Sequence, residues 1–194
     1  MNIEDMKIKL QQSLNEKRYL HSIGVMDECE KLALHYEADV NKARIAGLLH
    51  DCAKNISQSE ENTLLNKYEI KLDDIQKQSH ALVHGILGMY VAREKYNIND
   101  EEILDAIYWH TTGRAGMTLL EKIVFIADYI EPARTFDDTE EIRKNAYEDI
   151  DRAIVLSADS TIRYLLERKK LVHPLTLDTR NDAILTLYKK ASKS

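Results

Sequence analysis

The sequence contains few cysteines, few prolines, little glycine and no long hydrophobic run. Its two cysteines, Cys29 and Cys52, are too few for a disulfide scaffold, and we expect both to be reduced. No apolar stretch approaches the roughly 20 residues of a membrane span, and the N-terminus carries acidic residues where a signal peptide would be basic. The sequence therefore predicts a cytoplasmic protein with no membrane partner.

Positive charge is not in excess either. The 194 residues include 27 Lys and Arg against 33 Asp and Glu, which gives a formal net charge of −6. This balance disfavours a large electrostatic surface for DNA or RNA, so we expect no nucleic-acid partner, and a small anionic substrate would need a local basic pocket. With 44% hydrophobic residues and no evident linker, residues 1–194 are expected to form one domain.

Apolar residues recur mostly at intervals of three and four residues, which is typical of helices. Only six glycines and two prolines interrupt them, so the sequence predicts an all-α chain. Loops are expected over residues 132–138 and 171–178. The expected helices cover residues 3–14, 22–36, 40–53, 58–68, 82–95, 101–109, 119–130, 139–169 and 179–190.

One pair of polar residues stands out against this apolar background. His50 and Asp51 follow the run Ile45-Ala46-Gly47-Leu48-Leu49 at the end of a predicted helix. Burying an imidazole and a carboxylate together is costly unless something neutralises or coordinates them. A metal ion is the simplest solution, and a hydrogen-bonded pair at a helix C-terminus is the alternative.

Four further residues favour the metal. His21 follows a helix-like stretch, His84 and His110 stand beside apolar or aromatic residues, and Asp128 closes the apolar run 123–127. Imidazole and carboxylate donors together suit iron, manganese or zinc better than magnesium or calcium. From these residues alone, the sequence predicts a metal-assisted phosphohydrolase.

The order His, His-Asp, His, His, Asp resembles that of the HD-domain metal-dependent phosphohydrolases. The surrounding residues 18–25, 47–54, 110–113 and 122–134 are similar to the motifs of the YqeK family, the bacterial symmetrical bis(5′-nucleosyl)-tetraphosphatases. The motifs keep their order and spacing over almost the whole chain. The resemblance implies a single-domain, all-α HD-domain helical bundle.

The resemblance also implies a metal centre. His21, His50, Asp51 and Asp128 are expected to bind one divalent metal, iron or, as a second choice, manganese. His84 and His110, which with Asp51 are the expected catalytic residues, either hold a second ion bridged by Asp51 or lie at the substrate phosphates. His80 shares a helix face with His84 but is not expected to bind metal, because the family motif aligns with His84.

Substrate-binding residues follow from the resemblance and from charge. Arg18, Lys54 and Arg134 are expected at the substrate phosphates, and the planar fork of Arg134 suits bidentate contacts that a lysine cannot copy. The remaining expected substrate contacts are His84, His110, Thr111 and His173.

The function implied is metal-dependent hydrolysis of diadenosine tetraphosphate, and of related dinucleoside polyphosphates, to two ADP. Two alternatives stay open: an HD-domain hydrolase of another nucleotide, and a metal-containing nucleotide sensor without turnover. Dinucleoside polyphosphate and ADP are thus the expected partners, and a homodimer is also left open.

Overall fold

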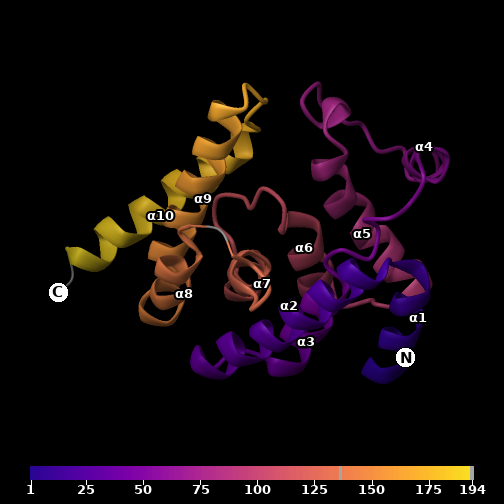
Figure 1. The fold of residues 1–194 in the computed structure, drawn as a ribbon, viewed down its shortest axis with the longest axis horizontal. Helices are drawn as coiled ribbons and strands as arrows, with labels where there is room; N and C mark the ends of the chain where they lie inside the picture. Colours follow the sequence, from indigo (N-terminus) through magenta and orange to yellow (C-terminus); the bar gives the residue numbers. More distant parts are fainter. Residues whose placement is uncertain (136, 193–194) are drawn as a thin grey trace.

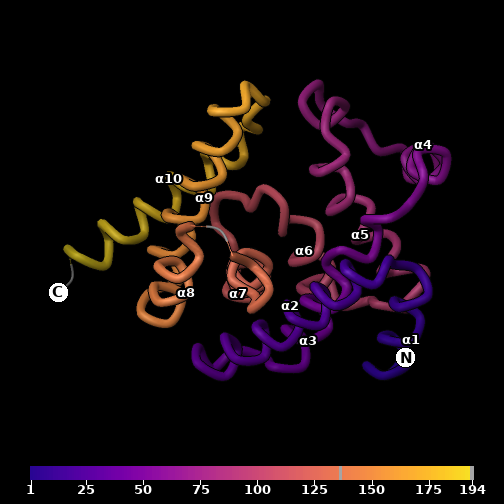
Figure 2. Tube along the Cα trace, in the orientation of Figure 1, coloured from indigo at the N-terminus to yellow at the C-terminus, as the bar shows by residue number. Residues whose placement is uncertain are grey.

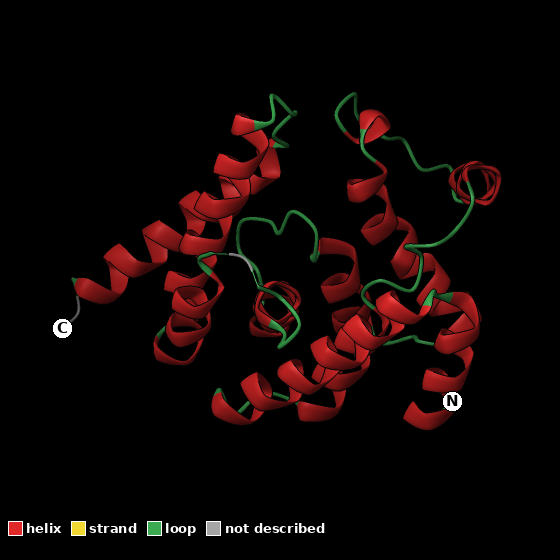
Figure 3. Cartoon of the chain, viewed as in Figure 1, coloured by secondary structure: helices red, strands yellow, loops and turns green. Residues whose placement is uncertain are grey.

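The computed structural model describes residues 1–135 and 137–192. Over these residues the chain is helical, with no strand (Figure 3), which confirms the predicted all-α class. None of the described helices is long and apolar enough to cross a membrane. In chain order the elements are α1 (Ile3–Ser13), α2 (Glu16–His35), α3 (Val40–Leu49), α4 (Gln58–Lys67), a short 3-10 helix (Gln76–Gln78), α5 (His80–Tyr96), α6 (Glu101–Trp109), α7 (Leu119–Ile130), α8 (Thr139–Glu148), α9 (Ile150–Glu167) and α10 (Pro174–Ala191).

Helix α7 lies at the centre of the molecule and is seen end-on in Figure 1. It packs against α2, α3, α6, α8 and α9. Its side chains Ile123, Val124, Ile126, Ala127 and Ile130 are fully buried, and a helix that is apolar around most of its circumference belongs in a protein interior. The central helix thereby carries Asp128 into the middle of the bundle.

Helices α2 and α3 approach each other closely at Gly47. A Cβ atom on Gly47 would lie 2.7 Å from Cys29 Sγ and 3.1 Å from Met26 Cα on α2. Backbones can come this near where a residue lacks a side chain. The close crossing brings His21 on α2 next to His50, which follows α3.

The prediction of one helix over residues 139–169 is wrong, because α8 and α9 share this stretch and meet at Asp149. Asp149 has an extended backbone, and its Oδ1 accepts a hydrogen bond from Asp151 N at 2.9 Å. Aspartate competes for backbone N–H groups in this way and so favours helix N-caps over helix interiors.

Other boundaries also differ from the prediction. Helix α2 begins at Glu16 rather than at residue 22, because Asn15 Oδ1 accepts from Arg18 N. Helix α10 begins at Pro174 rather than at residue 179, so the loop expected over residues 171–178 is shorter. Proline suits the first helical position, and His173 Nδ1 accepts from Leu175 N.

Helix α5 begins at His80 rather than at residue 82, and a further difference lies near the metal motif. Helix α3 ends at Leu49 rather than at residue 53, so His50 and Asp51 lie in the turns that follow it. The loop expected over residues 132–138 includes Phe136, which lies outside the described residues; the described residues on either side are not helical.

The trace in Figure 2 shows α9 and α10 running side by side away from α2 and α3.

Candidate active site

The six residues of the His, His-Asp, His, His, Asp series converge beside the central helix. Five of them are almost fully buried, with exposed fractions of 8% or less, and Asp128 is partly exposed. They come from α2 (His21), from the turn after α3 (His50, Asp51), from α5 (His84), from the end of α6 (His110) and from α7 (Asp128).

The four predicted metal ligands form one group. His21 Nε2 lies 3.2 Å from His50 Nε2 and 3.0 Å from Asp128 Oδ1. His50 Nε2 lies 3.4 Å from Asp51 Oδ2 and 3.8 Å from Asp128 Oδ1. Two imidazole nitrogens and two carboxylate oxygens therefore face a common point.

The remaining histidines form a second group on the other oxygen of Asp51. His84 Nε2 lies 2.9 Å from Asp51 Oδ1 and 3.0 Å from His110 Nε2, which is 3.8 Å from the same oxygen. Asp51 thus presents one oxygen to each group. This division is compatible with both expectations for His84 and His110, a second ion bridged by Asp51 or contact with substrate phosphates.

The hydrogen bonds behind the ligands fix which ring nitrogen carries the proton. His50 Nδ1 donates to Gly47 O and His110 Nδ1 donates to Ile107 O, both at 2.7 Å. A neutral histidine that donates from Nδ1 has a lone pair at Nε2. The Nε2 atoms of both rings face carboxylate oxygens of Asp51 or Asp128, so these nitrogens and oxygens together form a donor set that fits a metal ion.

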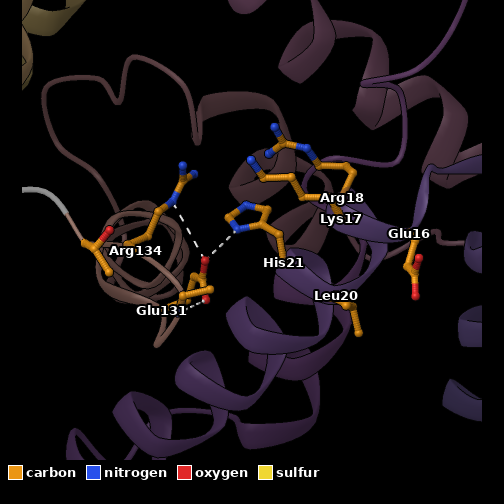
Figure 4. A pocket seen from close by; sticks show the side chains of 9 residues that line it. Glu16, Lys17, Arg18, Leu20, His21, Glu131 and Arg134 are labelled. Atoms are coloured by element: carbon orange, nitrogen blue, oxygen red, sulfur yellow. Dashed lines mark hydrogen bonds and ion pairs between the residues drawn. The ribbon is translucent and has the colours of Figure 1, made fainter.

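Glu131 fixes the proton of His21 at Nδ1 in the same way. The sequence alone did not assign this residue to the site. Its Oε1 accepts from His21 Nδ1 at 3.0 Å, and its Oε2 accepts from Ala133 N at 2.7 Å. Figure 4 shows the carboxylate between His21 and Arg134, whose Nε lies 3.9 Å from Oε1. Glu131 stands inside the motif 122–134, but its partner lies 110 residues away in the sequence. The position of Glu131 inside this motif is the sequence feature that could have identified it as a site residue.

Charge and burial set the protonation of the cluster. Burial lowers the pKa of His84 to about 4, despite the opposing effect of Asp51. Burial would raise the pKa of Asp51, but His50, His110 and His84 hold it well below its usual range. A neutral imidazole and ionised carboxylates are the protonation states that bind metals.

The three predicted phosphate-binding cations also gather here. Arg18 Nη1 donates to Asp51 Oδ2 at 2.6 Å, and Arg134 Nη2 donates to Asp128 Oδ1 at 2.7 Å. Lys54 Nζ lies 3.7 Å from Asp51 Oδ1, and burial lowers the pKa of its ammonium. All three stand where an anion approaching the carboxylates would meet them.

A cavity of about 260 Å³ opens beside the cluster, and we call it the central cavity. The predicted residue Thr111 lies in its wall, together with Tyr129 of α7 and Thr161 of α9, neither of which the sequence reasoning assigned. Its described lining comprises Arg18, Asp51, Lys54, Ala81, His84, His110, Thr111, Phe125, Asp128, Tyr129, Arg134 and Thr161.

His173 and His80 stand apart from the described lining of this cavity. His173 Nε2 donates to Asp73 Oδ2 at 2.7 Å while its Nδ1 caps α10, so its contact with substrate stays a prediction. His80 shares α5 with His84, but its Nδ1 contacts Glu61 Oε2 at 2.5 Å and its side chain is 43% exposed. Cys52, which directly follows Asp51, is buried and donates its thiol to Gly88 O.

Comparison with known proteins places this geometry in a class. The HD domain model matches residues 18–133, and the chain belongs to this family of metal-dependent hydrolases. An HD domain implies a divalent metal. This agrees with three overlapping groups of His and Asp residues, because the ligand atoms within each group lie within 4.8 Å of one another.

Individual relatives narrow the class. A protein of Halalkalibacterium halodurans named symmetrical bis(5′-nucleosyl)-tetraphosphatase is 44% identical over 172 residues, covering 89% of this chain and 91% of that protein. The Bacillus subtilis protein of the same name is 38% identical, covering 93% and 97%. These relatives confirm the resemblance to the YqeK family.

A solved structure shows the same fold. The crystal structure of a predicted HD superfamily hydrolase involved in NAD metabolism from Clostridium acetobutylicum has a TM-score of 0.88 and 40% sequence identity, covering 96% of this chain and 98% of that one. The predicted single-domain HD-domain bundle is therefore confirmed.

Proposed function

We propose that this chain hydrolyses diadenosine tetraphosphate, and related dinucleoside polyphosphates, symmetrically to two ADP with the help of a bound iron ion. The observation that supports it best is the convergence of imidazole nitrogens and carboxylate oxygens beside Arg18, Lys54 and Arg134, three cations that line the central cavity. The names of the Halalkalibacterium halodurans and Bacillus subtilis relatives support the choice of substrate.

The chain's own residues divide the work. His21, His50, Asp51 and Asp128 would hold the ion, which when bound polarises a phosphoryl group and lowers the pKa of a bound water. The cations Arg18, Lys54 and Arg134 bind the phosphates and oppose their charge. His84 and His110 complete the catalytic set with Asp51, near the negative charge that develops in the transition state.

The identity and number of the ions belong to the proposal. Mixed imidazole and carboxylate donors suit iron, and manganese is the second choice. One ion is expected, and His84 and His110 offer a place for another. Metal analysis of anaerobically purified protein checks the identity and the number of the ions. A protein that holds zinc in full occupancy and is active with it would contradict the choice of iron.

Several further predictions rest on composition and resemblance alone. They are a catalytic domain that extends over residues 1–194 beyond the matched stretch 18–133, ADP as the product, a homodimer, no nucleic-acid partner and a cytoplasmic location.

Chromatography of early products tests the function. Metal-loaded protein under anaerobic conditions should convert one diadenosine tetraphosphate to two ADP, whereas ATP and AMP would mean an asymmetric cut and would refute the proposed geometry. Consumption of another nucleotide instead would favour the alternative suggested by the Clostridium acetobutylicum relative's description. Tight binding of nucleotide without turnover would favour the sensor.

A further inference from the structure

A second cavity lies next to the central cavity and shares two residues with it. This outer cavity has a volume of about 540 Å³, and Arg18 and Arg134 line both cavities. In Figure 4, Arg18 and Lys17 extend from α2 toward Arg134, which follows α7. A polyphosphate held by the two arginines would therefore border both spaces.

The size of the central cavity requires such a neighbour. Sites for a single drug-sized ligand usually have about 300 to 1,000 Å³, and the central cavity has about 260 Å³. A dinucleoside tetraphosphate carries two nucleosides and four phosphates, so it cannot be enclosed there. At least one nucleoside must lie in an adjoining space. Another neighbouring cavity, of about 860 Å³, shares Tyr129 and Thr161 with the central cavity, whereas the outer cavity shares the two arginines expected at the phosphates.

The outer cavity offers a hydrogen-bond acceptor to a nucleoside at Glu16. This carboxylate lies in the wall beside Lys17, whereas the oxygens of Glu131, which also lines the cavity, already accept from His21 and Ala133. Carboxylates accept hydrogen bonds from hydroxyl and amino groups and repel phosphate. Ribose hydroxyls and an exocyclic amine provide such donors.

Leu20 supplies the apolar surface that a base needs. It lines the outer cavity, and 60% of its surface is exposed to solvent. Binding sites for small molecules combine apolar surface with a few polar groups. We propose that the outer cavity binds one nucleoside of the dinucleotide, with its base against Leu20, while the tetraphosphate spans Arg18 and Arg134; this assignment rests on the proposed function.

Leu20→Ser tests the assignment without adding charge, and Leu34→Ser is the matched control. Leu34 lies on the same helix, is 63% exposed and falls outside the described lining of both cavities. Two constants are measured for each protein: the KM for diadenosine tetraphosphate and the inhibition constant of inorganic tetraphosphate, which has four phosphates but no nucleoside.

Leu20→Ser should raise the KM for the dinucleotide about fivefold, because the base loses a leucine surface. The inhibition constant of inorganic tetraphosphate should stay within about twofold, because this molecule has no base to contact Leu20. Leu34→Ser should change neither constant. An unchanged KM in Leu20→Ser, or equal rises in both constants, would overturn the assignment.

Failure of the proposed function gives a different result. If the wild-type protein consumes no dinucleotide, the function fails, and calorimetric binding to metal-loaded protein then decides the cavity. Leu20→Ser must in that case weaken binding of diadenosine tetraphosphate more than binding of inorganic tetraphosphate; equal effects, or no binding of the dinucleotide, reject the nucleoside site.

Discussion

Glu131→Gln should weaken metal binding even though Glu131 is not a predicted ligand. The carboxylate accepts from two donors, His21 Nδ1 at 3.0 Å and Ala133 N at 2.7 Å, and its side chain is 4% exposed. Glutamine has a similar size but only one oxygen. One of the two donors must therefore face an amide NH₂ group, and water has little access to compensate.

Either orientation of the amide harms the site. If the oxygen turns to Ala133, the NH₂ group favours a His21 tautomer protonated at Nε2, the atom that faces His50 and Asp128. If the oxygen turns to His21, the loop at Ala133 is strained. Loss of a residue that orients a ligand weakens metal affinity about 10- to 100-fold, or about 1.4 to 2.7 kcal/mol.

The assay is competition for the metal with a chelator, followed by saturation to measure stoichiometry. Glu28→Gln is the control: it removes a carboxylate that is also 4% exposed and accepts from Tyr147 Oη at 2.7 Å, and it should lower stability but keep metal affinity. Nitrogen NMR of the metal-free protein should show His21 moving from the Nδ1–H to the Nε2–H tautomer in Glu131→Gln. Wild-type affinity with an unchanged His21 tautomer would refute the reasoning.

Three further predictions concern neighbouring residues. His50→Ala or Asp128→Ala should remove bound metal and activity together, whereas His80→Ala should keep the metal; metal analysis checks this, and equal losses in all three would mean that the wrong histidine was chosen. Arg134→Lys should retain metal but lower kcat/KM roughly tenfold, since one charged hydrogen bond is lost; unaltered kinetics would reduce Arg134 to a structural cation. Gly24→Ala should weaken metal affinity in the chelator assay, because its Cβ would lie 2.8 Å from Glu131 Oε2, and unchanged affinity would show that Glu131 moves aside without effect.

Three members of the cluster stood out in the sequence because each follows an apolar run. His50 and Asp51 follow five apolar residues or glycine, and Asp128 follows five apolar residues on α7. Burial of such runs brings the polar residues at their ends into the interior. The assignment of all six residues to one site came from the resemblance to the HD-domain family.

Contacts between distant segments could not be predicted in the same way. The bond between Glu131 and His21 joins residues 110 positions apart, and that between His173 and Asp73 joins residues 100 apart. Such pairs depend on how helices cross, which a periodic pattern does not specify. The break between α8 and α9 at Asp149 was not predicted for a local reason. One side-chain hydrogen bond outweighs the helical preference of the neighbouring residues.

The wall of the central cavity has a consequence for how this enzyme can diversify. Thr161 comes from α9, outside the stretch 18–133 that the HD domain model matches, and Tyr129, the residue after Asp128, donates to Ser160 Oγ of α9 at 2.6 Å. Most of this wall therefore belongs to the same stretch as the ligands, whereas Thr161 belongs to a later part of the chain that packs against α7. Mutations in α9 can reshape the space offered to a nucleotide while the metal ligands stay unchanged, so selection can explore new substrates without first losing the metal.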